Sequence, residues 1–142
     1  MILTPQAIVL VAKGAGFDAP LLPTLCAVAL RESAGNPAVH NGNAATGDDS
    51  WGLWQINLKV PQIAALLAKN GITNGPQLLD PATNARAYKL LFDSEPNKMK
   101  ALGELAYIYD GLAQHQVYQT RYEQHLPVAQ WAALQVALGV VT

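Results

Sequence analysis

An acidic residue, Glu32, closely follows an apolar run in the segment LCAVALRESAGN, residues 25–36. If this run is a helix, Glu32 stands four residues after Val28 and seven after Leu25, in line with the apolar stripe. Partial burial raises the pKa of a carboxyl group, so such a glutamate can hold its proton near neutral pH and donate it to a leaving group. Spacing alone favours the simpler interpretation, an exposed helix-end glutamate or one paired with Arg31 or another cation.

Helices must position this residue, and the sequence predicts several. Thr4-Pro5 and Asp80-Pro81 each place a capping side chain before a proline at the first helical position. Residues 33–50 are rich in Gly, Asn, Ser and Asp, which is typical of a loop, and WGLWQINLKV after them favours a short strand or hairpin arm. We expect helices over residues 5–13, from 18–21 to 32, and over 61–70, 80–93, 99–111 and 128–141.

The last apolar stretch, residues 128–141, places Trp131, Leu134 and Leu138 at helical spacing. We expect it to pack on the core, with docking on a partner as the alternative. For Trp131 itself the choice is between a core position and a partner contact.

Composition excludes several classes of protein. The chain has 142 residues, 51% of them hydrophobic and 13% charged, with a net charge of −1. The length predicts a single domain over residues 1–142. The small net charge predicts no general attraction to nucleic acid or anionic lipid. The apolar runs at 7–12 and 25–30 are far shorter than the roughly 20 residues of a membrane span. No basic residue precedes Lys13, so we expect no signal peptide, and Cys26, the one cysteine, is expected to be a small buried hydrophobe.

Three ordered blocks carry a resemblance to a known family. They are Glu32-Ser33 with Asn36-Pro37, then SWGLWQIN at residues 50–57, then DPATNARAYKLL at residues 80–91. Together they resemble the lysozyme-like superfamily of lytic transglycosylases and goose-type lysozymes, in the form carried by bacteriophages. The resemblance covers about residues 22–93 and implies a lysozyme-like fold, all-α with a minor β-hairpin and a cleft between helices. In this context the catalytic interpretation of Glu32 becomes the favoured one.

The resemblance also implies roles for individual residues. Glu32 would protonate the glycosidic oxygen between N-acetylmuramic acid and N-acetylglucosamine, and then act as a base towards water or the sugar's own hydroxyl. Ser50 and Gln55 would line the cleft and bind substrate. Asn57, in the same block, is a further candidate. Gly52 would let the backbone approach the sugar or turn tightly, and an ordinary hairpin turn explains it equally well.

Aromatic residues offer further contacts. Trp51 is a candidate for stacking on a sugar ring, with core packing as an equal alternative, whereas for Trp54 core packing is favoured. The family's later Ala-Tyr-Asn-x-Gly block is degraded to LAYIYDGLA at residues 105–113, so either Tyr107 or Tyr109 would face Glu32. Tyr107 is slightly favoured because it follows an alanine, as in the family.

The attacking group is left open by the sequence. Hydrolysis of a glycoside generally uses two carboxylates, and Asp48 and Asp49 are candidates for the second one, although a turn or capping role is the simpler explanation. Lytic transglycosylases need no second acid, because the sugar's C6 hydroxyl closes onto C1.

The sequence therefore predicts a muramidase or lytic murein transglycosylase that acts on peptidoglycan glycan strands. No metal or organic cofactor is implied, and phage structural proteins are further expected partners. We expect it in a phage virion, tail-associated, or in the host cytoplasm before delivery to the cell wall. The alternative is a catalytically weak lysozyme-fold module with a structural or wall-binding role. His40, His115 and His125 lack zinc-ligand spacing and are expected on the surface or in loops.

Overall fold

Capping side chains and prolines begin the helices of the computed structural model, which describes residues 1–43, 45–95 and 123–140. The Thr4 hydroxyl accepts a hydrogen bond from the Ala7 N–H at 3.1 Å, and a carboxylate oxygen of Asp80 accepts one from the Thr83 N–H at 3.0 Å. Both helices predicted from these signals are present. The described helices are α1 (Pro5–Gly14), η1 (Ala19–Leu21), α2 (Leu22–Ser33), α3 (Pro61–Lys69), η2 (Pro76–Leu79), α4 (Pro81–Ser94) and α7 (Leu126–Ala137). The helix predicted over 99–111 lies outside the described residues.

A small antiparallel sheet accompanies the helices, in the order β1-β2-β3. Its strands are β1 (His40–Asn43), β2 (Asp48–Trp51) and β3 (Ile56–Asn57). Thus β1 and most of β2 occupy residues predicted as loop, and the arm predicted after Ser50 is reduced to the two residues of β3. The loop prediction was wrong because HNGN and DDSW are polar, and β1 is exposed throughout, so no alternation of apolar residues marks them.

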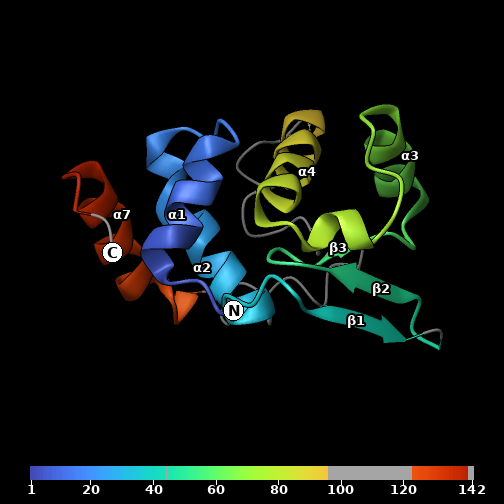
Figure 1. Cartoon of the computed structure of the whole chain (residues 1–142), viewed down its shortest axis with the longest axis horizontal. Helices are drawn as coiled ribbons and strands as arrows, with labels where there is room; N and C mark the ends of the chain where they lie inside the picture. Colours follow the sequence, from blue (N-terminus) through green and yellow to red (C-terminus); the bar gives the residue numbers. More distant parts are fainter. Residues whose placement is uncertain (44, 96–122, 141–142) are drawn as a thin grey trace.

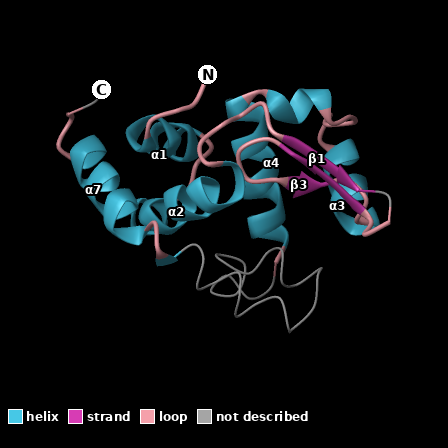
Figure 2. Cartoon of the chain, turned by 90° about the horizontal axis from the view of Figure 1, so that it is seen from below, coloured by secondary structure: helices cyan, strands magenta, loops and turns pink. Residues whose placement is uncertain are grey.

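The molecule is mostly helical with this one small sheet, as predicted for a lysozyme-like fold. In Figure 1, α7, α1 and α2 lie together at one end, while α3, α4 and the sheet form the other. Figure 2, from below, shows the strands on the side of α4 that faces away from α7. The sheet therefore lies at the side of the molecule opposite α7.

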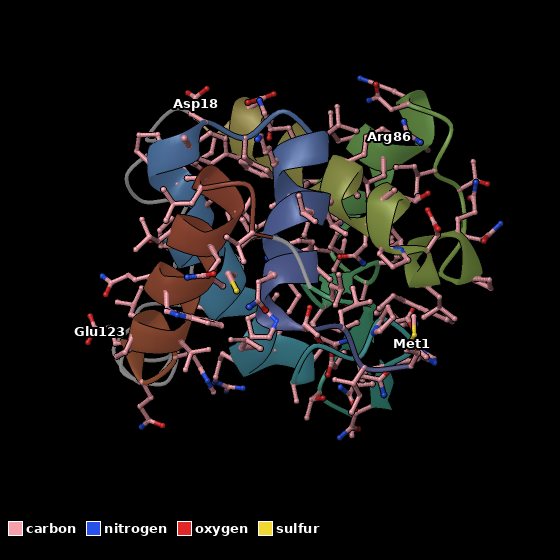
Figure 3. All side chains as sticks on the ribbon, turned by 60° about the vertical axis from the view of Figure 1, so that its left-hand side comes forward. Met1, Asp18, Arg86 and Glu123 are labelled. Carbon is pink, nitrogen blue, oxygen red and sulfur yellow. The ribbon has the colours of Figure 1, made fainter. Side chains whose placement is uncertain are left out.

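The middle of α2 lies entirely within the core, and its residues Leu25–Ala29 are all at most 1% exposed. Cys26 and Trp54 are buried there, as predicted. The charged side chains Asp18, Arg86 and Glu123, in contrast, lie at the periphery of the molecule (Figure 3). No helix among the described residues combines the length and the apolar character that crossing a membrane requires. The larger fully buried side chains are Ile8, Val9, Leu25, Val28, Leu53, Leu67, Ile72, Leu78 and Asn84.

The helix predicted at 128–141 is α7, and it packs on α1 and α2 as expected. It does so through small residues: Ala129 and Ala132 are fully buried and Val136 is 7% exposed. The apolar residues singled out from the sequence point elsewhere, because Trp131, Leu134 and Leu138 are 51%, 55% and 67% exposed. A core position for Trp131 is therefore excluded.

Candidate functional site

Glu32 lies in the last turn of α2 and is half-buried. Val28 and Leu25, which share its stripe, are 1% and 0% exposed, and the Oε1 atom of Glu32 is itself shielded from solvent. The carboxyl group thus lies at the border between core and surface, where a carboxylic acid is partly removed from water.

The end of α2 is held by the chain around it. Ala34 caps the helix in the left-handed conformation, with φ 52°, and its N–H donates to the Leu30 carbonyl at 3.0 Å. The Leu3 N–H donates to the Gly35 carbonyl at 2.8 Å, which ties the helix end to the N-terminal segment. A Cβ at Gly35 would lie 2.9 Å from the Leu3 carbonyl oxygen, so only glycine fits this contact. These contacts give the Glu32 backbone a defined position.

The sheet brings Ser50 and Asn57 together, because they are register partners on β2 and β3. The buried Ser50 hydroxyl donates a hydrogen bond to the Asp48 carboxylate. The Asn57 side-chain oxygen accepts from the N–H groups of Asp49, at 3.1 Å, and Lys59, at 2.9 Å. All of these side chains hold the turn of the hairpin and the central strand in place.

Asp49 is the centre of a second group of contacts, across β1 and β2. One of its oxygens lies 2.7 Å from Nε2 of His40 and accepts the Trp51 indole N–H at 3.0 Å. The hydrogen bond with His40 has the largest effect on the Asp49 carboxyl group and lowers its pKa. Partial desolvation raises this pKa by less, and the Trp51 hydrogen bond and the charges of His40 and Lys59 lower the pKa further. Asp49 is therefore ionised at neutral pH.

Trp51 is half-buried and already has two neighbours on its ring. The His40 ring stacks on it with centroids 3.5 Å apart and planes 13° apart. The Gly75 backbone is so close that a Cβ there would lie 2.0 Å from Cε2 of the indole. A sugar that stacks on Trp51 would have to use the part of the indole that these groups leave exposed.

The backbone of Gly52 packs closely against other segments of the chain. It has φ +78°, and a Cβ there would lie 2.2 Å from the Leu78 carbonyl oxygen and 2.3 Å from Nδ2 of Asn84. Because no side chain fits in this space, the turn after β2 can rest directly on η2 and α4. The local tight turn is thus accompanied by a close contact between distant segments.

Asn84 is a polar residue whose role the sequence analysis missed. It is 0% exposed, and its side-chain oxygen accepts the Trp54 N–H at 3.0 Å. Its Nδ2 donates to the carbonyl oxygens of Trp51, at 2.8 Å, and Leu78, at 2.9 Å. The available signal was the Asn of the DPATN block, which comes three residues after the proline that begins α4.

Gln55 connects the turn to β1. Its Nε2 donates to the Val39 and Gly52 carbonyls at 3.2 and 2.9 Å, and its Oε1 accepts from Asn41 at 2.8 Å.

Tyr107 and Tyr109 lie outside the described residues. Within the described ranges 1–43, 45–95 and 123–140, no three His, Cys, Asp or Glu side chains gather as a metal site would require.

Comparison with known proteins gives one match. A family model described as a lysozyme-like domain matches residues 9–97, which include Glu32, the whole sheet and α4. No curated protein and no solved structure matches the chain significantly.

Proposed function

Because the chain belongs to the lysozyme-like domain family, we propose that it cleaves the β-1,4 bond between N-acetylmuramic acid and N-acetylglucosamine in peptidoglycan. Muramidase and lytic transglycosylase activities are general in this family. The observation that carries the proposal is the position of Glu32, at the end of a buried helix with one carboxyl oxygen shielded from solvent.

In the proposed mechanism, Glu32 is the general acid. Its proton passes to the glycosidic oxygen while the bond from that oxygen to C1 breaks, so the leaving sugar departs as an alcohol. The resulting Glu32 carboxylate then takes a proton from the group that attacks C1. Attack by water gives a reducing end, and attack by the sugar's own C6 hydroxyl gives a 1,6-anhydro end.

The hairpin supplies the other candidate groups. Asp49, ionised at neutral pH, and its neighbour Asp48 are the candidates for a second carboxylate, which would stabilise positive charge at C1 or activate water. For binding we propose Ser50, Trp51, Gly52 and Asn57, together with Tyr107 or Tyr109, whereas the amide of Gln55 is already engaged with Val39, Gly52 and Asn41.

The experiment that tests the proposal is clearing of purified peptidoglycan by wild type and by Glu32→Gln. General acid catalysis contributes about 10²- to 10⁴-fold, so we expect the substitution to lower the rate by that factor. We expect the Tm to be unchanged or raised, because a partly desolvated acid is replaced by a neutral group of the same shape. Glu123→Gln, at an exposed glutamate far along the chain, is the matched control and should clear at the wild-type rate.

Mass spectrometry of the released fragments then distinguishes anhydro ends from reducing ends. If wild type clears no peptidoglycan of any chemical type, the enzymatic proposal is wrong. Retention of that inactive protein on sedimented peptidoglycan would instead support the alternative, a wall-binding module with the same fold.

A further inference from the structure

Gln55 has a backbone conformation that glutamine rarely adopts. Its φ is +49°, in the left-handed region that favours glycine. Among the described residues other than glycine, Ala34 is the one further case, and there the conformation ends α2. A glycine would adopt this conformation at position 55 without strain, so the glutamine side chain has to supply something in return.

The Gln55 side chain supplies three hydrogen bonds. Both of its N–H groups donate to backbone carbonyls, at Val39 and Gly52, and its oxygen accepts the Asn41 side chain. A glutamine side chain has two donor hydrogens, so none of its donor capacity is left for a ligand. The amide is therefore engaged with the protein on both sides.

The partners of Gln55 lie in or beside both strands, towards the base of the β1–β2 pair, the end opposite the turn that connects the strands. Val39 immediately precedes β1, Asn41 lies within it, and Gly52 immediately follows β2. The Val39 carbonyl also accepts the Gly52 N–H, at 2.8 Å, so the segments before β1 and after β2 meet at this one oxygen atom. Gln55 thus joins the base of the strand pair to the turn that rests on α4.

The strands of the pair bury few of their own side chains. All four residues of β1 are exposed, and in β2 only Ser50 is buried. Without an apolar face, a strand pair depends on hydrogen bonds for its position and opens easily. The hydrogen bonds of Gln55 therefore tie β1 to the turn after β2, which itself rests on η2 and α4.

We propose that Gln55 is a positioning residue: through Asn41 and Val39 it holds the β1–β2 strand pair in the orientation that catalysis needs, and it does not bind substrate itself. The catalytic part of this inference rests on the proposed function. The structural part, which concerns the order of the strand pair, does not.

The kinetic test is a double-mutant cycle with Gln55→Gly and Asn41→Ala on solubilised glycan strands. Gln55→Gly keeps the left-handed backbone without strain and removes only the side chain. Losing two or three ordinary hydrogen bonds predicts a fall in kcat of about tenfold with little change in KM, and Asn41→Ala should lower kcat several-fold. In the Gln55→Gly background, Asn41→Ala should have no further effect. A raised KM in Gln55→Gly with a neutral Asn41→Ala would instead identify Gln55 as a substrate contact and overturn the proposal.

A second readout does not depend on activity. The Gly52 amide, which donates to Val39, should exchange its hydrogen about tenfold faster in Gln55→Gly, and several-fold faster in Asn41→Ala. The Ile8 amide in α1 should be unchanged in both. Unchanged exchange at Gly52 would overturn the proposal even if wild type is fully active. If wild type cleaves nothing, the proposed function fails, and the exchange rates still decide whether Gln55 holds the strand pair.

Discussion

At the scale of single residues, polar side chains hold the hairpin and the turn after it, because they bind backbone groups of distant segments. Asn84 is the most buried of them and binds three backbone groups in two other segments. Its carbonyl oxygen and its amino group face partners of opposite kind, so the orientation of the amide is determined by its surroundings.

Asn84→Asp is expected to destabilise the protein by about 2–4 kcal/mol, although the shape of the side chain is kept. The aspartate places an oxygen against the carbonyls of Trp51 and Leu78, to which the asparagine donated. Urea unfolding of wild type and variant measures the difference. The control is Asn70→Asp, where an exposed Nδ2 donates to the Leu66 carbonyl and the loss should be about 1 kcal/mol or less. Equal effects at the two positions would show that burial of Asn84 does not matter.

At the scale of elements, the helices were predictable from local signals, whereas the hairpin was not. Thr4 and Asp80 cap helices that begin with proline. In each case the capping residue, the proline and the bonded N–H group lie within four consecutive residues. The strands β1 and β2 are joined by backbone hydrogen bonds between polar residues, and their side chains bear no pattern of burial. The local sequence therefore gave no signal for this strand pair.

The direction of α7 is a second feature that its sequence did not reveal. The helix LPVAQWAALQVA has apolar residues on all sides, so periodicity does not choose one face. In the structure the small side chains Ala129 and Ala132 face α1 and α2, because they let the helices approach closely, and the larger ones remain exposed.

A substitution that adds apolar bulk to the buried face of α7 should therefore lower stability. A substitution that removes an apolar side chain from the exposed face should have little effect. Ala132→Leu adds bulk to a fully buried position and is expected to lower stability by about 1–3 kcal/mol, despite the gain in apolar surface. Leu134→Gln changes a residue that is 55% exposed and should stay within about 0.5 kcal/mol of wild type. Thermal unfolding of both variants is the measurement. A large loss for Leu134→Gln with a silent Ala132→Leu would mean that the helix packs by its other face.

At the scale of the whole molecule, the buried thiol of Cys26 reports on global opening. Burial raises its pKa to about 12, above its ordinary value of 9.0, and its Sγ lies 3.5 Å from the Pro5 carbonyl oxygen. Since the thiolate is the reactive form, the folded protein should resist alkylation at neutral pH.

Iodoacetamide at pH 8 is thus expected to label Cys26 only on unfolding, at a rate that rises with urea along the unfolding curve. The raised pKa also makes stability depend on pH, because between pH 9 and 12 the folded state keeps a proton that the unfolded state loses. The contribution of Cys26 to the free energy of unfolding is therefore full below pH 9 and falls as the pH rises towards 12. Fast labelling of the native protein at pH 8 would show that α2 opens locally, independently of global unfolding.

The sequence by itself determined the helices that begin at capped prolines, the burial of Cys26 and Trp54, the place of Glu32 at the end of an apolar helix, and the lysozyme-like family. These follow from short-range signals and from ordered motifs, which are properties of neighbouring residues. Only the tertiary structure decided which polar groups bind each other. Asn84 reaches Trp51 across 33 positions and Asn41 reaches Gln55 across 14, because folding brings their segments together and a buried amide must then find partners.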